Sequence, residues 1–141
     1  MTPLDLSRQA PRGPRETALG FYFLPRTIDK LRAELPGGNL GAYVNHDTGF
    51  SAYVVRRLGL DMNELRNVVA HARDEDAVAE WLARRIDASA APALNAKLET
   101  FVVERMSADD QVLVRKRHPV MVRRPGLSKI LDILEADDRQ A

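Results

Sequence analysis

Hydrophobic residues recur at helical spacing near the start of the chain. The first set is separated by four, three and four positions, at Leu24, Ile28, Leu31 and Leu35. This spacing places the four side chains on one face of a helix over about residues 25–35. Pro25 suits the first helical turn, where its missing N–H leaves no acceptor unsatisfied. The sequence Pro36-Gly37-Gly38 is expected to end the helix.

The same spacing predicts further helices along the rest of the chain. They are expected at residues 47–57, 61–72, 74–87, 92–106 and 107–117, and from Ser128 onward. Asp47, Asp61, Asp74 and Ser107 are expected N-caps, and residues 119–125 are expected to be irregular. Since no strand with a period of two is found, the predicted fold class is all-α, a compact bundle of six or seven short helices. Residues 1–141 are expected to form a single helical domain.

The first 18 residues differ from the rest because they are rich in proline and arginine and show no periodicity. Residues that precede proline avoid helical geometry, so Ala10 and Gly13 favour extended backbone. We therefore expect an extended N-terminal arm, packed on the helical domain through its leucines.

Composition limits the compartment and the chemistry. The chain has no cysteine, which excludes disulfides and thiolate sites and suits a reducing cytoplasm. The longest apolar run, residues 19–24, is too short to span a bilayer. The protein is expected to be cytoplasmic and soluble, with no membrane partner.

Charge is balanced over the chain but is sorted into blocks. The net charge is only +1, which disfavours nucleic acid as a partner. One basic block lies in the arm and the first helix, and a second covers residues 115–129. Acidic residues gather at 74–76 and 135–138. Opposite blocks of this kind could pair within the chain or between chains.

No catalytic or metal-binding motif is present. The histidines, His46, His71 and His118, lack the helical spacing of a zinc-binding pair. Ser51, in Gly49-Phe50-Ser51-Ala52-Tyr53, lacks the second glycine of a nucleophile elbow. No metal and no cofactor are therefore expected, catalytic residues stay unassigned, and the sequence leaves open whether the protein is an enzyme.

The arginine-rich stretch is the best candidate for a site. Arg12, Arg15 and Arg26 can each grip a carboxylate or phosphate through two parallel hydrogen bonds. The remaining expected ligand-binding residues are Asp29 and Lys30, on the polar side of the first helix, and Tyr43 and His46, in the following loop. The alternative is that the arginines pair with the protein's own Asp and Glu, including the acidic C-terminal block, and attach the arm to the body.

Several stretches resemble one known family. They are PRGPR at 11–15, Leu19-Gly20, LPRTIDKLR at 24–32, the helices around 50–60 and 74–82, and the acidic ending at 133–139. Together they are similar to the bacterial family of uncharacterised small proteins catalogued as domain of unknown function 5069. The resemblance implies a compact helical bacterial protein and supplies no activity. Its signature contains Arg12, Arg15, Arg26, Asp29, Lys30 and Arg32.

The first functional hypothesis is a cytoplasmic small-domain protein that binds an anionic small molecule through its N-terminal arginine cluster. The second is a protein-interaction or homo-oligomeric module in which charge blocks pair between chains. The third is an enzyme that uses Asp29, Tyr43, His46 or Asp47 as acid and base groups. Nucleic-acid binding through residues 115–129 ranks last.

Overall fold

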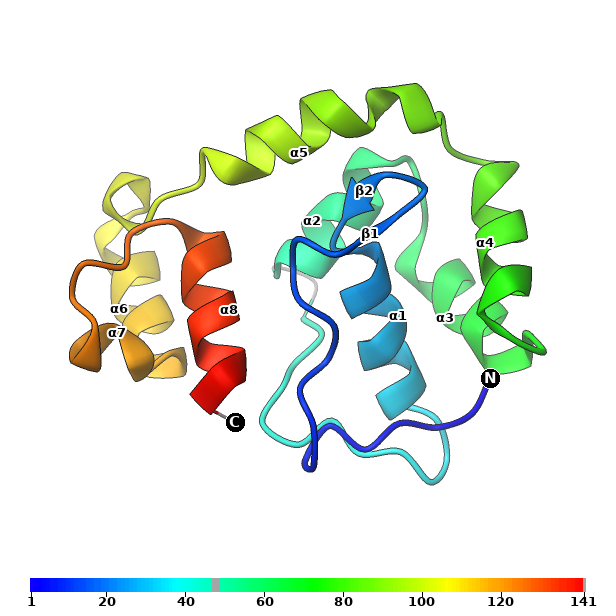
Figure 1. Ribbon diagram of the computed structural model, residues 1–141, viewed down its shortest axis with the longest axis horizontal. Helices are drawn as coiled ribbons and strands as arrows, with labels where there is room; N and C mark the ends of the chain where they lie inside the picture. Colours follow the sequence, from blue (N-terminus) through cyan, green and yellow to red (C-terminus); the bar gives the residue numbers. More distant parts are fainter. Residues whose placement is uncertain (47–48, 141) are drawn as a thin grey trace.

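The computed structural model describes residues 1–46 and 49–140, and this part of the chain is mostly helical (Figure 1). The helices are α1 (Leu24–Ala33), α2 (Phe50–Arg57), α3 (Met62–His71), α4 (Glu75–Ala83), α5 (Ala91–Glu99), α6 (Ala108–Arg117), α7 (Val120–Arg123) and α8 (Ile130–Gln140). Short 3-10 turns are η1 (Ala88–Ala90) and η2 (Val103–Arg105). No helix in the described ranges is long and apolar enough to cross a bilayer.

A small sheet corrects the expected all-α class to a mostly helical one. The strands β1 (Thr17–Ala18) and β2 (Phe21–Tyr22) pair in antiparallel register, with Ala18 opposite Phe21. The turn between them, Leu19-Gly20, has positive φ angles of 53° and 85°, which suits a two-residue hairpin. Strands of two residues are too short to produce an alternating pattern in the sequence.

Three of the predicted N-caps are confirmed. Asp61 accepts hydrogen bonds from the N–H groups of Asn63 and Glu64, and Asp74 accepts one from Ala77. Ser107 caps α6 in the same way. The fourth, Asp47, lies outside the described residues.

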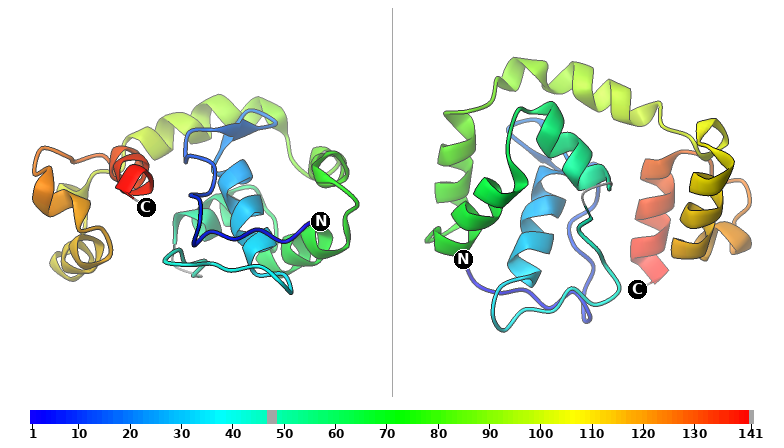
Figure 2. Two further views of the ribbon diagram at one scale, coloured as in Figure 1. Left: turned by 60° about the horizontal axis from the view of Figure 1, so that its bottom comes forward. Right: turned by 180° about the vertical axis from the view of Figure 1, so that it is seen from behind.

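Some helix boundaries differ from the prediction. Helix α5 ends at Glu99, and the segment up to 106 holds the separate turn η2. Part of the expected irregular segment, residues 120–123, is the one-turn helix α7. We call residues 1–99 the main lobe and residues 103–140 the C-terminal lobe. Helix α5 arches from one side of the main lobe towards the C-terminal lobe (Figures 1 and 2).

Each lobe is organised around its own cluster of buried apolar side chains. The main cluster combines β2, α1, α2, α3, α4 and α5, and it also includes Leu131 of α8. The second cluster combines η2, α7 and α8. Phe50, Phe101 and Leu134 pack against both clusters, and the rings of Phe50 and Phe101 lie 5.7 Å apart. The junction between the lobes is therefore packed in part by aromatic side chains.

The N-terminal arm runs along the main lobe and not away from it (Figure 1). Leu4 donates its N–H to the carbonyl of Arg32, and Leu6 donates to Asn39. The Leu6 side chain is buried. Further along, the arm passes between α1 and α8, which brings its arginines to the boundary of the two lobes.

Candidate functional site

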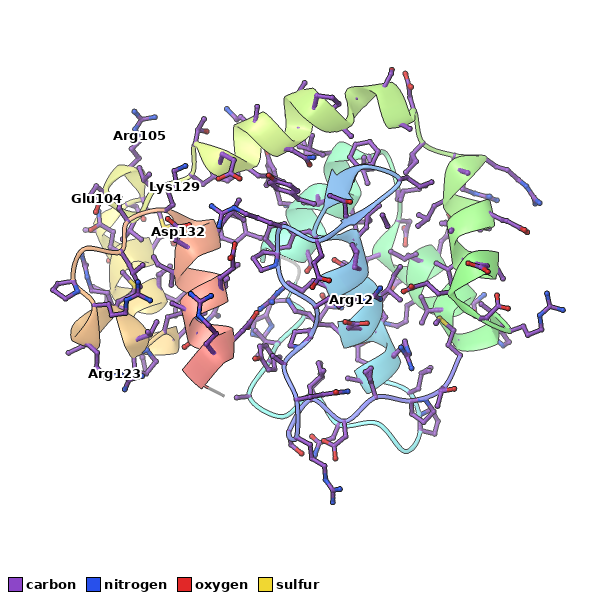
Figure 3. The ribbon with its side chains drawn as sticks, in the orientation of Figure 1. Arg12, Glu104, Arg105, Arg123, Lys129 and Asp132 are labelled. Atoms are coloured by element: carbon purple, nitrogen blue, oxygen red, sulfur yellow. The ribbon has the colours of Figure 1, made fainter. Side chains whose placement is uncertain are left out.

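Arg12, labelled in Figure 3, lies on the arm and binds carboxylates of α1 and α4. Its guanidinium donates to Asp29 through Nη2, at 2.9 Å, and through Nε. Its backbone N–H also donates to Asp29, at 2.8 Å. On the other side, Nη1 donates to Glu75 at 3.0 Å, and this hydrogen bond lowers the pKa of the Glu75 carboxyl. Asp29 is buried, and is not on a solvent-facing polar surface.

Arg15 joins α5 to α8. Its Nε and Nη2 donate to the two carboxylate oxygens of Glu99, at 3.0 and 2.8 Å. The same guanidinium lies 2.9 Å from Asp132, which is in the first turn of α8 (Figure 3), and it also pairs with Glu135. The hydrogen bonds from Arg15 lower the pKa of Glu99 to about 2.

Arg26 projects from α1 and binds the far end of α8. Its Nη1 and Nη2 donate to the two oxygens of Asp138, at 2.7 and 3.1 Å. Only 3% of Arg26 is exposed. The Tyr43 hydroxyl also donates to Asp138, and burial together with the Asp138 charge raises the pKa of Tyr43.

All three arginines therefore bind carboxylates of this chain. This agrees with the interpretation in which the arm is attached to the body, and the acidic C-terminal block supplies part of the attachment. The charge blocks considered for pairing between chains pair within the chain at these positions. Binding of an external ligand by Arg12 and Arg15 stays a prediction.

A cavity of about 920 Å³ lies between the two lobes. Four of the expected residues line it: Arg26, Lys30, Tyr43 and His46. Within the described part of the chain, Arg12, Arg15 and Asp29 are not among its walls. Apolar side chains from both lobes also line the cavity. They are Phe23 and Phe50 from the main lobe and Ile133 and Leu134 from α8.

Lys30 lines the cavity and has no carboxylate within ion-pair distance among the described residues. Its Nζ lies 3.4 Å from the hydroxyl of Ser51, at the start of α2. Burial lowers the pKa of Lys30 to about 8, and the nearby charge of Arg26 acts in the same direction. Arg26 and Lys30 are four residues apart on α1, so they point to the same side of the helix.

The cavity wall also contains polar atoms without a partner. The amide nitrogen and oxygen of Asn45 are buried, and neither has a hydrogen bond. The Nε of Arg26 is buried and unpaired as well. Buried polar groups almost always have a partner, so these atoms are exceptions among the described residues.

A second polar pair enters the cavity from the C-terminal lobe. The Nδ1 of His118 lies 2.8 Å from a carboxylate oxygen of Asp137, and both residues line the cavity. Because a carboxylate accepts, Nδ1–H is the donor in this contact.

The comparison with family models gives one match. The model described as Domain of unknown function (DUF5069) matches residues 8–140. The chain belongs to this family. The resemblance seen in the sequence is therefore confirmed, and the DUF5069 match includes the arm arginines and the described cavity walls. A comparison with curated proteins finds no match.

Sequence reasoning missed Ser51, Asn45 and the His118–Asp137 pair of this DUF5069 protein. Ser51 was considered only as part of a nucleophile elbow. Its contact with Lys30 joins α1 and α2, and no sequence motif connects the two residues. Asn45 is an ordinary loop residue in the sequence. Within the described residues, no group of three or more His, Cys, Asp or Glu side chains is arranged to hold a metal ion.

Proposed function

We propose that the protein binds a small anionic molecule in the cavity between its lobes, with Lys30 as the main anchor. The observation that carries this proposal is the ammonium group of Lys30. It lies in the cavity wall, its pKa is lowered to about 8 by burial, and no described carboxylate is within ion-pair distance. A buried charge without a partner is unfavourable, and a bound anion would supply that partner.

The charges around Lys30 support an anion over a cation. Two aspartates line the described cavity, Asp110 and Asp137. The lysines and arginines that line it are Arg26, Lys30, Lys116, Arg117 and Arg123. An excess of one sign in a concave site with low-dielectric walls concentrates ligands of the opposite sign.

The remaining groups suggest how such a ligand would be oriented. Phe23 and Phe50 provide an apolar surface beside Lys30. The cavity volume lies in the range of small-molecule sites. A carboxylate or phosphate attached to a small apolar body fits this combination.

Thermal unfolding in the presence of inorganic phosphate or citrate tests the proposal. We expect the Tm of the wild-type protein to rise with anion concentration at pH 7, because a ligand that binds only the folded state stabilises it. The Lys30→Met variant is expected to lose this dependence. A matched series in sodium chloride separates specific binding from an ionic-strength effect.

Lys97→Met is the matched control, since Lys97 is an exposed lysine on α5 outside the cavity lining. Its response to phosphate and citrate should equal that of the wild type. An equal anion response in wild type and Lys30→Met, or none in the wild type at millimolar concentration, would contradict the proposal.

A further inference from the structure

Lys30 and Ser51 form an isolated polar pair in the cavity wall. The Nζ–Oγ distance is 3.4 Å, and Ser51 is only 2% exposed. In the described part of the chain, neither side chain has another hydrogen-bond partner. Two helices, α1 and α2, thus bring an amine and a hydroxyl together.

A serine hydroxyl becomes an effective nucleophile when a base lies within hydrogen-bond reach. A lysine can act as that base only in its neutral form. Burial and the neighbouring charge of Arg26 favour the neutral form of Lys30, while the charge of Asp138 opposes it. The lowered pKa of about 8 gives Lys30 a usable neutral fraction near physiological pH.

The first turn of α2 adds hydrogen-bond donors beside Ser51. The first helical bond runs from the N–H of Tyr53 to the carbonyl of Gly49, so the N–H groups of residues 50–52 lack helical acceptors. Gly49 supplies no side-chain cap, and it lines the cavity together with Phe50 and Ser51. Such donors stabilise the negative charge that develops on a carbonyl oxygen during nucleophilic attack.

We propose that Ser51 and Lys30 are the nucleophile and the general base of an esterase site that cleaves a small ester. The apolar wall of Phe23, Phe50 and Leu134 would receive the acyl group. The proposal uses the same cavity as the anion site but the neutral form of Lys30, so the two proposals can fail separately.

The reaction balances with water as the only co-reactant. The Ser51 oxygen forms a bond to the ester carbon while its proton passes to Lys30. The bond to the alcohol oxygen then breaks, and the alcohol leaves with that proton. Water next attacks the acyl group on Ser51, gives one proton to Lys30, and releases a carboxylic acid as Ser51 regains its hydrogen.

The His118–Asp137 pair is the rival base in the same cavity. A histidine held by a carboxylate through Nδ1 is a common activator of serine. The structure shows no hydrogen bond between Ser51 and His118, whereas it shows one between Ser51 and Lys30. We therefore assign Lys30 as the general base, and a His118→Gln variant distinguishes the two candidate bases.

A fluorophosphonate probe on the full chain tests the site, with intact mass and peptide mapping as the readout. Reaction forms an Oγ–phosphorus bond and expels fluoride. We expect one adduct, on Ser51, with a rate that increases about tenfold between pH 7 and pH 9 as Lys30 loses its proton. Hydrolysis of 4-nitrophenyl butyrate should follow the same pH dependence.

Four variants make the outcome decisive. Ser51→Ala should lose the adduct, and Lys30→Met should react at least about a hundredfold more slowly. Lys30→Arg keeps the positive charge but has no neutral form at pH 9, so it should retain phosphate binding and lose labelling. His118→Gln should react at the wild-type rate.

Several results would overturn the esterase site. They are no adduct in the wild type at pH 9, an adduct on another residue, an unchanged rate in folded Lys30→Arg, or a loss of labelling in His118→Gln. Phosphate binding that persists in any of these cases would leave the anion site standing.

Discussion

At the scale of single residues, Lys30 is a cation whose charged form is disfavoured by burial in the main lobe. Its neighbours Arg26 and Asp29 are more deeply buried, and each has an ion-pair partner, Asp138 and Arg12 respectively. The sequence places Lys30 on the polar side of α1, but it cannot say whether that side faces water or a cavity. That depends on the 42–46 loop, α2 and the C-terminal lobe, which no local pattern describes.

Replacing Lys30 with methionine should stabilise the protein. The folded pKa of Lys30, about 8, lies below the ordinary 10.5. The buried ammonium therefore destabilises the folded state fully below pH 8, and this destabilisation disappears as the pH rises towards 10.5. We expect Lys30→Met to gain about 1–3 kcal/mol at pH 7, with a smaller gain at pH 10. Urea unfolding of both proteins at the two pH values measures this, and a variant less stable than wild type at pH 7 would contradict it.

At the scale of elements, short-range interactions were sufficient to predict from the sequence where three of the helices begin. Asp61, Asp74 and Ser107 cap the helices that follow them because an N-cap needs only one short polar side chain and the next turn. The sheet and the end of α5 were not predicted. Two-residue strands carry no period, and α5 stops where Glu99 meets Arg15 from a distant segment.

The contact between Arg15 and Glu99 should make the α5–α8 junction sensitive to acid. A folded pKa of about 2, against an ordinary 4.5, means that stability present above pH 4.5 is lost as the pH falls towards 2. We expect the free energy of unfolding of Glu99→Gln to be about 1–2 kcal/mol lower than that of the wild type at pH 7. The two values should become equal near pH 2. Chemical denaturation across this range is the measurement.

Glu80→Gln is the control for this comparison, because Glu80 is an exposed residue on α4. It should match the wild type at every pH. A constant difference between Glu99→Gln and the wild type from pH 7 to pH 2 would show that the ion pair does not carry the effect.

At the scale of the whole molecule, the cavity lies where the C-terminal lobe is held beside the main lobe. The main cluster and the second cluster share only a few side chains, and charged contacts from Arg15 and Arg26 complete the junction. The sequence indicated both charge blocks and left open whether they pair within the chain. It could not indicate the cavity, whose walls come from α1, α2 and the C-terminal lobe.

Removing the Arg26 side chain should loosen the C-terminal lobe. Arg26→Met leaves Asp138 largely buried without its guanidinium partner, and breaking such a pair costs about 3–5 kcal/mol. We expect faster amide hydrogen exchange in α8 and unchanged exchange in α3. Arg66→Met, which removes a more exposed pair with Glu34, should change stability by less than about 1 kcal/mol. Equal exchange rates in α8 of Arg26→Met and wild type would contradict the proposed role.

The ion pairs of the arm also have a consequence for the order of folding. Arg15 reaches Glu99 and Glu135 across 84 and 120 positions of sequence, and Arg26 reaches Asp138 across 112. Contacts between such distant positions form slowly, because a long loop must close before they contribute. We therefore expect the main lobe to form first, with only one wall of the cavity. Ligand binding would then begin at the last step, when the C-terminal lobe docks.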